Sequence, residues 1–199
     1  AALINAAERP LVLSGQGVEL GNATEELRAF VEKADIPVGC TLLGLSTLPH
    51  GHRLRKGMLG MHGNLGPNTK TNECDLLIAV GMRFDDRVTG RLDAYAKQAK
   101  VIHLDIDPAE INKNVHADVA VLGDCKDTLT RLTAAIEERK HTAWIDSFAP
   151  YEEKEYNEVI REAIHPEEGS LRMGEVARAV SEASGNKAIL VTDVGQNQM

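Results

Sequence analysis

The stretch Asp75–Gly90, DLLIAVGMRFDDRVTG, joins an uninterrupted apolar run to a cluster of charges. Its first part shows no alternation of apolar and polar residues, which is typical of a strand buried on both faces of a parallel sheet. Its second part places two arginines and two aspartates directly after that strand. Because ligands of open parallel sheets bind beyond the carboxyl ends of the strands, the stretch predicts a buried strand with a polar site at its end.

Other segments continue this pattern of short apolar strands and intervening helices. The further strand candidates are residues 11–14, 36–40, 100–107 and 119–124. Residues 22–34 have helical periodicity with Asn22 as the expected N-cap, and residues 126–140 form a second amphipathic helix. This alternation predicts an α/β fold, a Rossmann-like doubly wound parallel sheet of about six strands with helices on both faces.

The predicted sheet is interrupted by one long connection and followed by a change in character. Residues 41–71 are rich in turn signals and predict an irregular, functional or mobile segment. We therefore expect a nucleotide-binding domain at residues 1–140, then a connector with helices at residues 141–185. The run KAILVTD predicts a strand that starts a further domain at residues 186–199. The chain begins within a helical pattern without methionine, which indicates a piece of a larger polypeptide.

Composition narrows the classes of partner and compartment. The 22 basic and 30 acidic residues give a net charge of −8, which disfavours nucleic acid or an anionic membrane as the main partner. The three cysteines have no CxxC spacing, so neither a disulfide scaffold nor a zinc site is indicated. No apolar run approaches the roughly 18 to 20 residues that span a bilayer, and a soluble intracellular protein is expected.

Polar or glycine-rich residues follow every predicted strand, in the order SGQG, CTLLG, GMRFDDR, DIDP and GDC. Glycines permit close backbone approach, arginines bind phosphate, and aspartates accept hydrogen bonds from ribose or adenine. The strand ends therefore predict a nucleotide site. Two local alternatives remain: the glycines could serve only a tight turn, and the MRFDDR charges could pair with one another at the surface.

The histidines give a weaker signal than the strand ends. His62, in LGMHG, could be a base, a metal ligand or a hydrogen-bonding wall residue. His50, His52 and His62 lack the spacing of a helical metal site, and we predict no metal ligand in this chain. His103 lies within an apolar strand and is interpreted as a buried core residue. The GQG turn also lacks the third glycine of a dinucleotide fingerprint, which disfavours a conventional NAD site.

Taken in order, SGQG, TLLG, LGMHG, GMRFDDRVTG, HLDIDPAEINKN and VLGDC resemble the central FAD-binding domain of the acetolactate synthase (acetohydroxyacid synthase) large subunit. This is a family of thiamine-diphosphate enzymes, and the resemblance covers essentially the whole chain. It implies an enzyme that condenses pyruvate with pyruvate or 2-ketobutyrate after thiamine-diphosphate-dependent decarboxylation, in the biosynthesis of valine, leucine and isoleucine. The alternatives are another thiamine-diphosphate-dependent decarboxylase, oxidase or carboligase, and a standalone nucleotide-binding module.

The resemblance also implies cofactors and partners. The full-length enzyme would be a cytoplasmic flavoprotein that binds FAD without a net redox step, together with thiamine diphosphate and Mg²⁺. Its substrates would be small 2-keto acids, and it would form a homodimer or homotetramer with a small regulatory subunit. The catalytic glutamate and the metal ligands would lie in segments outside these 199 residues, so no catalytic residue is expected here.

Site residues follow from the resemblance by position. Asp86 and Arg87 would face the substrate channel, where the arginine can bind a keto-acid carboxylate. Two positions depart from the family pattern, since Gln16 interrupts a glycine run and Asn197 stands where histidine is common. The residues implied to contact FAD or, at the C-terminal end, thiamine pyrophosphate are Gly15, Gln16, Gly17, Thr41, Leu42, Gly60, Met61, His62, Gly63, Gly81, Met82, Arg83, Asp85, Arg87, Val88, Asp105, Ile106, Gly123, Asp124, Val194, Gly195, Gln196 and Asn197.

Overall fold

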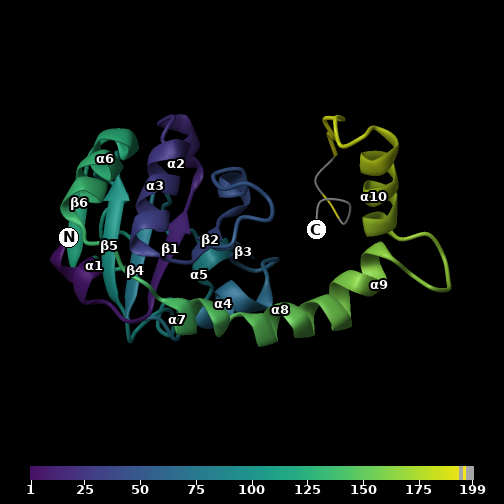
Figure 1. Ribbon diagram of the computed structural model, residues 1–199, viewed down its shortest axis with the longest axis horizontal. Coiled ribbons are helices and arrows are strands. Elements are labelled where there is room, and N and C mark those ends of the chain that lie inside the picture. Colours follow the sequence, from purple (N-terminus) through teal and green to yellow (C-terminus); the bar gives the residue numbers. More distant parts are fainter. Residues whose placement is uncertain (193–194, 196–199) are drawn as a thin grey trace. The chain divides into compact units, whose positions relative to one another are not determined.

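The computed structural model of the chain describes residues 1–192 and Gly195 (Figure 1). The chain divides into two compact units, Ala1–Ala149 and residues 150–199. The predicted domain boundaries at residues 140 and 185 stay a prediction.

Unit 1 is built on one six-stranded sheet in which every neighbouring pair of strands is parallel. The order across the sheet is β3-β2-β1-β4-β5-β6, which is that of a Rossmann fold. The predicted fold class is therefore confirmed. The strands are β1 (Pro10–Ser14), β2 (Val38–Cys40), β3 (Arg55–Met58), β4 (Leu76–Val80), β5 (Lys100–Asp105) and β6 (Val119–Leu122).

Helices and short turns connect these strands (Figure 1). Asp124 caps α6 by accepting hydrogen bonds from the backbone N–H groups of Lys126 and Asp127, as acidic N-caps do. The elements of unit 1 are α1 (Ala2–Ala6), α2 (Gln16–Leu20), α3 (Thr24–Ala34), the 3₁₀ turn η1 (Leu42–Gly44), α4 (Leu65–Thr71), α5 (Asp86–Thr89), α6 (Cys125–Ala135) and α7 (Thr142–Asp146).

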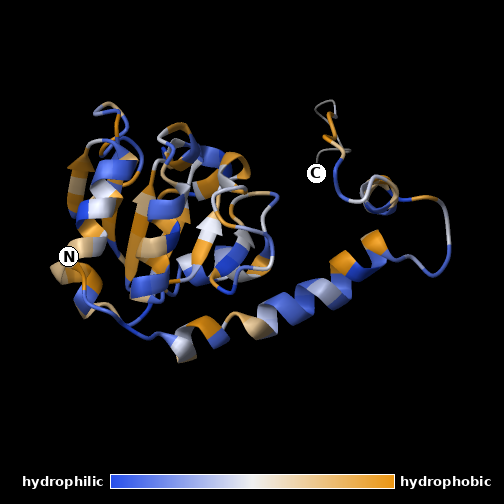
Figure 2. Cartoon of the chain, turned by 45° about the horizontal axis from the view of Figure 1, so that its top comes forward, coloured by the Kyte–Doolittle hydropathy of each residue, from blue (hydrophilic) through white to orange (hydrophobic). Residues whose placement is uncertain are grey.

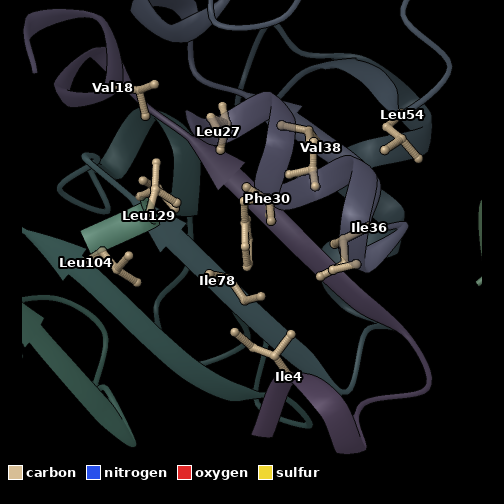
Figure 3. Close-up of a cluster of buried hydrophobic side chains, with 14 of the residues drawn as sticks. Ile4, Val18, Leu27, Phe30, Ile36, Val38, Leu54, Ile78, Leu104 and Leu129 are labelled. Carbon is tan, nitrogen blue, oxygen red and sulfur yellow. The ribbon is translucent and has the colours of Figure 1, made fainter. Parts of the chain in front are cut away.

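Apolar side chains pack on both faces of the sheet. On one face Phe30 of α3 and Leu129 of α6 are fully buried beside Ile78 of β4 (Figure 3). On the other face Trp144 of α7 and the neighbouring Phe148 pack in a second buried cluster with strand residues such as Leu77. The central strands β1 and β4 are buried along their whole length, as continuous apolar runs predict.

Four predictions about local structure were wrong. Asn22 has a left-handed φ of 48° and does not cap α3, whose N-cap is Ala23. The expected glycine turn contains α2, and the expected irregular connection contains η1, β3 and α4. Strand β6 is not buried on both faces, because it lies at the edge of the sheet and most of its residues are exposed. Pairing with β2 produces β3, and the edge position exposes β6; local patterns report neither.

The end of unit 1 is fastened to the sheet by buried polar contacts. Trp144 donates its indole N–H to the Pro10 carbonyl at 2.8 Å. The His141 ring lies between carbonyl oxygens, with Nδ1 3.0 Å from Ala34 O and Nε2 3.1 Å from Ala7 O. The sequence had given no signal for His141, because its flanking residues are polar. These contacts hold residues 141–148 against the rest of unit 1.

Unit 2 is mainly helical in its described part. It contains α8 (Ala149–Glu155), the π-helical segment η2 (Tyr156–Ile160), α9 (Arg161–Ile164) and α10 (Met173–Ala183). The segment from α8 to α9 is largely hydrophilic (Figure 2), as its charged sequence predicted. Residues 187–192 form no strand, so that expectation was wrong for them; a strand exists only when a neighbour supplies ladder hydrogen bonds. Within the described residues, no helix has the length and apolar character to cross a membrane.

Asp35, at the end of α3, ties three segments together and should make stability depend on pH. Its carboxylate accepts hydrogen bonds from the Arg53 guanidinium and from the His141 backbone N–H. Burial raises the pKa of Asp35, but the Arg53 and His141 hydrogen bonds and nearby positive charge outweigh burial, so its pKa lies below the ordinary value. Its ionised form therefore adds stability above the unfolded pKa of about 3.9, and this stability is lost as pH falls through the lower folded pKa.

We expect Asp35→Asn to lower the free energy of unfolding at pH 7 by about 1–3 kcal/mol, because a buried charged acceptor is lost. Between pH ~5 and ~3 the variant should lose less stability than the parent chain. Urea unfolding followed by circular dichroism checks both effects. Asp93→Asn is the control, since Asp93 also pairs with an arginine but is 70% exposed. Equal behaviour of the two variants would contradict the role of Asp35.

Candidate functional site

The carboxyl ends of four neighbouring strands line a cavity of about 490 Å³, here called the strand-end cavity. The strand order reverses between β1 and β4, which is where doubly wound sheets bind ligands. Its lining residues are Gln16, Gly17, Leu20, Thr41, Leu42, Leu43, Gly81, Met82, Arg83, Asp85, Arg87, Val88, Asp105, Asp107 and Glu110.

Backbone packing between the turns after β1 and β4 shapes the floor of this cavity. The Gly17 N–H donates to Gly81 O, and the Gly15 N–H donates to Val80 O, both at 3.0 Å. A Cβ on Gly17 would lie 2.7 Å from the Gly81 Cα. The glycines thus allow the two turns to pack closely, and the N–H groups of Gly15 and Gly17 are already bonded to protein.

Charges of the MRFDDR stretch form one wall. Asp85 caps α5 by accepting from the Arg87 backbone N–H at 3.0 Å, and its other oxygen pairs with the Arg83 guanidinium. The hydrogen bond from Arg87, followed by contributions from Asp86 and Arg83, holds the pKa of Asp85 below its usual range. Arg83 therefore has an internal partner, while the Arg87 side chain makes no ion pair with any residue in the described part of the chain.

Carboxylates gather beyond β5, the strand next to β4. Asp105 accepts from the Asp107 N–H at 2.9 Å, and Asp107 accepts from the Ala109 N–H at 2.9 Å. Glu110 pairs with Lys113 at 2.8 Å. Of the three acids that line the cavity after β5, the sequence predicted only Asp105. The signal for Asp107 and Glu110 was the short stretch DPAE, residues 107–110. This turn follows β5 and keeps both side chains near the strand end.

A buried histidine contacts the turn after β4. His103 is fully buried, as predicted for a core residue. Its Nε2 lies 2.9 Å from Met82 O, so Nε2 carries the proton and donates. The ring also packs edge-on against Phe84, with centroids 5.0 Å apart. Because Phe84 has a left-handed φ of 50°, these contacts help to fix the backbone that presents Arg83.

The cavity also carries an apolar surface. Leu20, Leu42 and Leu43 line it and are 77%, 51% and 59% exposed. Leu20 and Leu43 were not predicted, because they lie on α2 and η1, in segments that the sequence analysis assigned to turns. Exposed leucines around a polar cavity suit a ligand with a flat hydrophobic ring.

Some predicted site residues lie beside the strand-end cavity. Gly60, Met61 and Asp86 line a second cavity of about 330 Å³, and Arg87 and Val88 line both cavities. The Met61 N–H donates to Arg87 O at 2.8 Å. The backbone at these positions therefore separates the two cavities, with Arg87 at the wall between them.

Other predicted residues lie elsewhere. Gly15 lies beneath Gly81 and Met82, and none of Gly15, His62, Gly63, Ile106 and Asp124 lines either cavity. Gly123 lines a different, largely apolar cavity beside β6, and Asp124 is used as the cap of α6. Gly195 belongs to unit 2, and Val194, Gln196 and Asn197 lie outside the described residues. The assignment of all these positions to cofactors stays a prediction.

Comparison with known proteins identifies one family. The model described as thiamine pyrophosphate enzyme, central domain, matches residues 1–132. The chain is 43% identical over 206 residues to a probable acetolactate synthase large subunit of Methanocaldococcus jannaschii, covering 100% of this chain and 34% of that protein. It is 43% identical to the acetolactate synthase large subunit of Parasynechococcus marenigrum (99% of this chain, 32% of that protein).

A third relative gives a similar result. The acetolactate synthase large subunit of Lactococcus lactis is 39% identical over 197 residues, covering 98% of this chain and 33% of that protein. The chain thus spans about a third of the length of the curated relatives that it matches.

Gly81→Ala should damage the floor of the strand-end cavity. Gly81 has a φ of 58°, and its added Cβ would lie 2.7 Å from the Gly17 Cα. Gly51→Ala is a matched control, because Gly51 also has a positive φ, 83°, but nothing lies within 4 Å of its Cβ position. The control should lose about 1–2 kcal/mol of unfolding free energy from backbone strain. Gly81→Ala should lose a further ~1–3 kcal/mol from overlap, and equal losses in urea unfolding would contradict the packing contact.

Proposed function

Because the chain belongs to the family of thiamine pyrophosphate enzyme central domains, we propose that it is the central domain of an acetolactate synthase large subunit. The finer assignment is supported by 39 to 43% identity to such subunits over 98 to 100% of the chain. The observation that carries it is the strand-end cavity, whose charged wall is built by the family-specific stretch GMRFDDRVTG.

The whole protein would condense pyruvate with pyruvate or 2-ketobutyrate in branched-chain amino-acid biosynthesis. Thiamine diphosphate, held with Mg²⁺ mainly by segments outside these 199 residues, would supply the chemistry of decarboxylation and carbon–carbon bond formation. The protein would act in the cytoplasm as a homodimer or homotetramer with a small regulatory subunit.

The residues of the strand-end cavity fit FAD. Arg83 and Arg87 provide positive charge for the pyrophosphate, and the exposed leucines offer an apolar surface to a flat ring. Acceptors at the end of β5, Asp105 first, suit the hydroxyl groups of the adenosine half. Arginines, acidic acceptors and apolar residues thus line one cavity, and these groups match the pyrophosphate, the hydroxyl groups and the flat ring of a dinucleotide.

Arg87 is proposed to recognise substrate as well as cofactor. It lines both cavities, and no ion pair within the described residues neutralises it. A guanidinium binds a carboxylate through two parallel hydrogen bonds, so it can orient the carboxylate of a 2-keto acid. Asp86, on the same helix, lines the second cavity and would face the same channel.

A coupled assay of acetolactate formation by the full-length protein tests the proposal directly, and absence of product from pyruvate would refute it. In that protein Arg87→Ala should raise the KM for pyruvate by about ten- to a hundredfold, because a charge-assisted hydrogen bond is lost. Arg91→Ala is the control, since Arg91 is exposed, pairs with Asp93 and lines neither cavity. Equal KM values for the two variants would remove Arg87 from the substrate site.

The 199-residue chain by itself should form no acetolactate, because the catalytic glutamate and metal ligands are proposed to lie in other segments. It should also bind FAD weakly, since other domains of the full-length protein contribute contacts to the flavin. Product assay and FAD titration by flavin fluorescence check these expectations. Product formation by the purified chain, or tight stoichiometric flavin binding, would show that the missing segments are unnecessary.

A further inference from the structure

Asn68 of α4 holds Gly60 by two hydrogen bonds. Its Oδ1 accepts from the Gly60 N–H at 2.9 Å, and its Nδ2 donates to the Gly60 carbonyl at 2.8 Å. A backbone N–H only donates and a carbonyl oxygen only accepts, so these two partners fix the orientation of the amide. An ionised aspartate, which only accepts, would supply one of the two bonds, and an aliphatic side chain would supply neither.

Gly60 in turn lies against the backbone of α5. It has a φ of 100°, and a Cβ there would lie 2.4 Å from Arg87 O and 3.1 Å from the Val88 Cα. The next backbone N–H, that of Met61, donates to Arg87 O at 2.8 Å. Carbonyl groups in the last turn of a helix have no partner within that helix, so Met61 supplies a donor that α5 itself lacks. Asn68 is therefore connected to the Arg87 backbone through Gly60 and Met61.

The backbone of Arg87 matters because the Arg87 side chain makes no ion pair within the described part of the chain. The location of its guanidinium therefore depends on where α5 is held. Two parallel hydrogen bonds to a carboxylate require the guanidinium to face both oxygens, and a displacement of about 1 Å costs much of such an interaction. Asn68, Gly60 and Met61 line the second cavity together with Arg87.

We propose that Asn68 is a positioning residue for substrate recognition. Through Gly60 and Met61 it holds the α5 backbone where the Arg87 guanidinium meets the carboxylate of a 2-keto acid. The inference rests on the proposed function for the identity of that ligand. Asn68 lies in the connection, residues 41–71, that sequence patterns describe only as irregular, and no motif assigned it a role.

Steady-state kinetics of the full-length protein with pyruvate test this role. Asn68→Ala removes both hydrogen bonds to Gly60 and should raise the KM for pyruvate by about three- to tenfold. The kcat should change by less than about twofold, as expected when binding of ground state and transition state weakens equally. Asn5→Ala is the matched control, because Asn5 also accepts from a distant backbone N–H, that of Glu137 at 3.1 Å, but lines neither the strand-end cavity nor the second cavity. Its KM should stay unchanged.

A double-variant cycle separates positioning from a general effect on stability. If Asn68 acts through Arg87, Asn68→Ala should cause no further rise in KM when it is added to Arg87→Ala, whereas independent residues give fold-changes that multiply. If Asn68→Ala does not fold, as judged by circular dichroism, Asn68→Asp replaces it in the same cycle. That variant keeps the acceptor for the Gly60 N–H and loses the donor, and any repulsion of pyruvate by its charge remains in the Arg87→Ala background.

Hydrogen exchange followed by mass spectrometry gives a second readout, which does not depend on activity. In the full-length protein Asn68→Ala should speed the exchange of backbone amides in residues 58–64 and also in residues 86–91, because α5 loses its fixed neighbour. Asn5→Ala should change neither segment.

The two readouts distinguish failure of this inference from failure of the proposed function. An unchanged KM, fold-changes that multiply in the cycle, or unchanged exchange in residues 86–91 would overturn the positioning role of Asn68. If the parent protein forms no product from pyruvate but Asn68→Ala speeds exchange in residues 86–91, the proposed function and the identity of the ligand are refuted, while the hold of Asn68 on Arg87 stands.

Discussion

The contact between the turns after β1 and β4 is the constraint on which the candidate site depends. The Gly17 N–H bonds to Gly81 O at 3.0 Å, and neither glycine leaves room for a Cβ. This approach brings two strand ends together at the point where the strand order reverses. The α2 helix then begins directly above the contact, and the MRFDDR turn leaves from its other side. Any side chain at these positions would separate the two walls of the cavity.

Local pairing within the MRFDDR stretch accounts for only part of the charge that lines the cavity. Asp85 neutralises Arg83 and also caps α5, so half of the charged stretch stabilises its own turn. Arg87 lines both cavities, and Asp105, Asp107 and Glu110 add acidic groups after β5. The result is a cavity lined by arginines, carboxylates and exposed leucines, a combination that suits the flavin dinucleotide proposed above.

Sequence patterns predicted those strands and helices whose formation depends on residues close together in the chain. The continuous apolar runs became β1, β2, β4 and β5, and the amphipathic stripe of residues 22–34 became α3 with Phe30 in the core. The same reasoning failed where pairing partners are distant. Strand β3 is short and half-buried, with bonds to β2 in an irregular register, so its sequence shows no apolar run. Residues 187–192 are apolar but form no strand within the described chain, because an apolar run does not itself provide a partner.

The sequence by itself determined the class of fold, the order of the polar strand ends and the resemblance to one enzyme family. These follow from local periodicity and from motifs of consecutive residues. Only the tertiary structure decided which groups remain available to a ligand. Folding uses the N–H groups of Gly15 and Gly17 and the carboxylate of Asp124 for internal hydrogen bonds. It leaves the Arg87 side chain on the wall of both cavities without an ion pair among the described residues, because pairing between residues far apart in the chain depends on three-dimensional position.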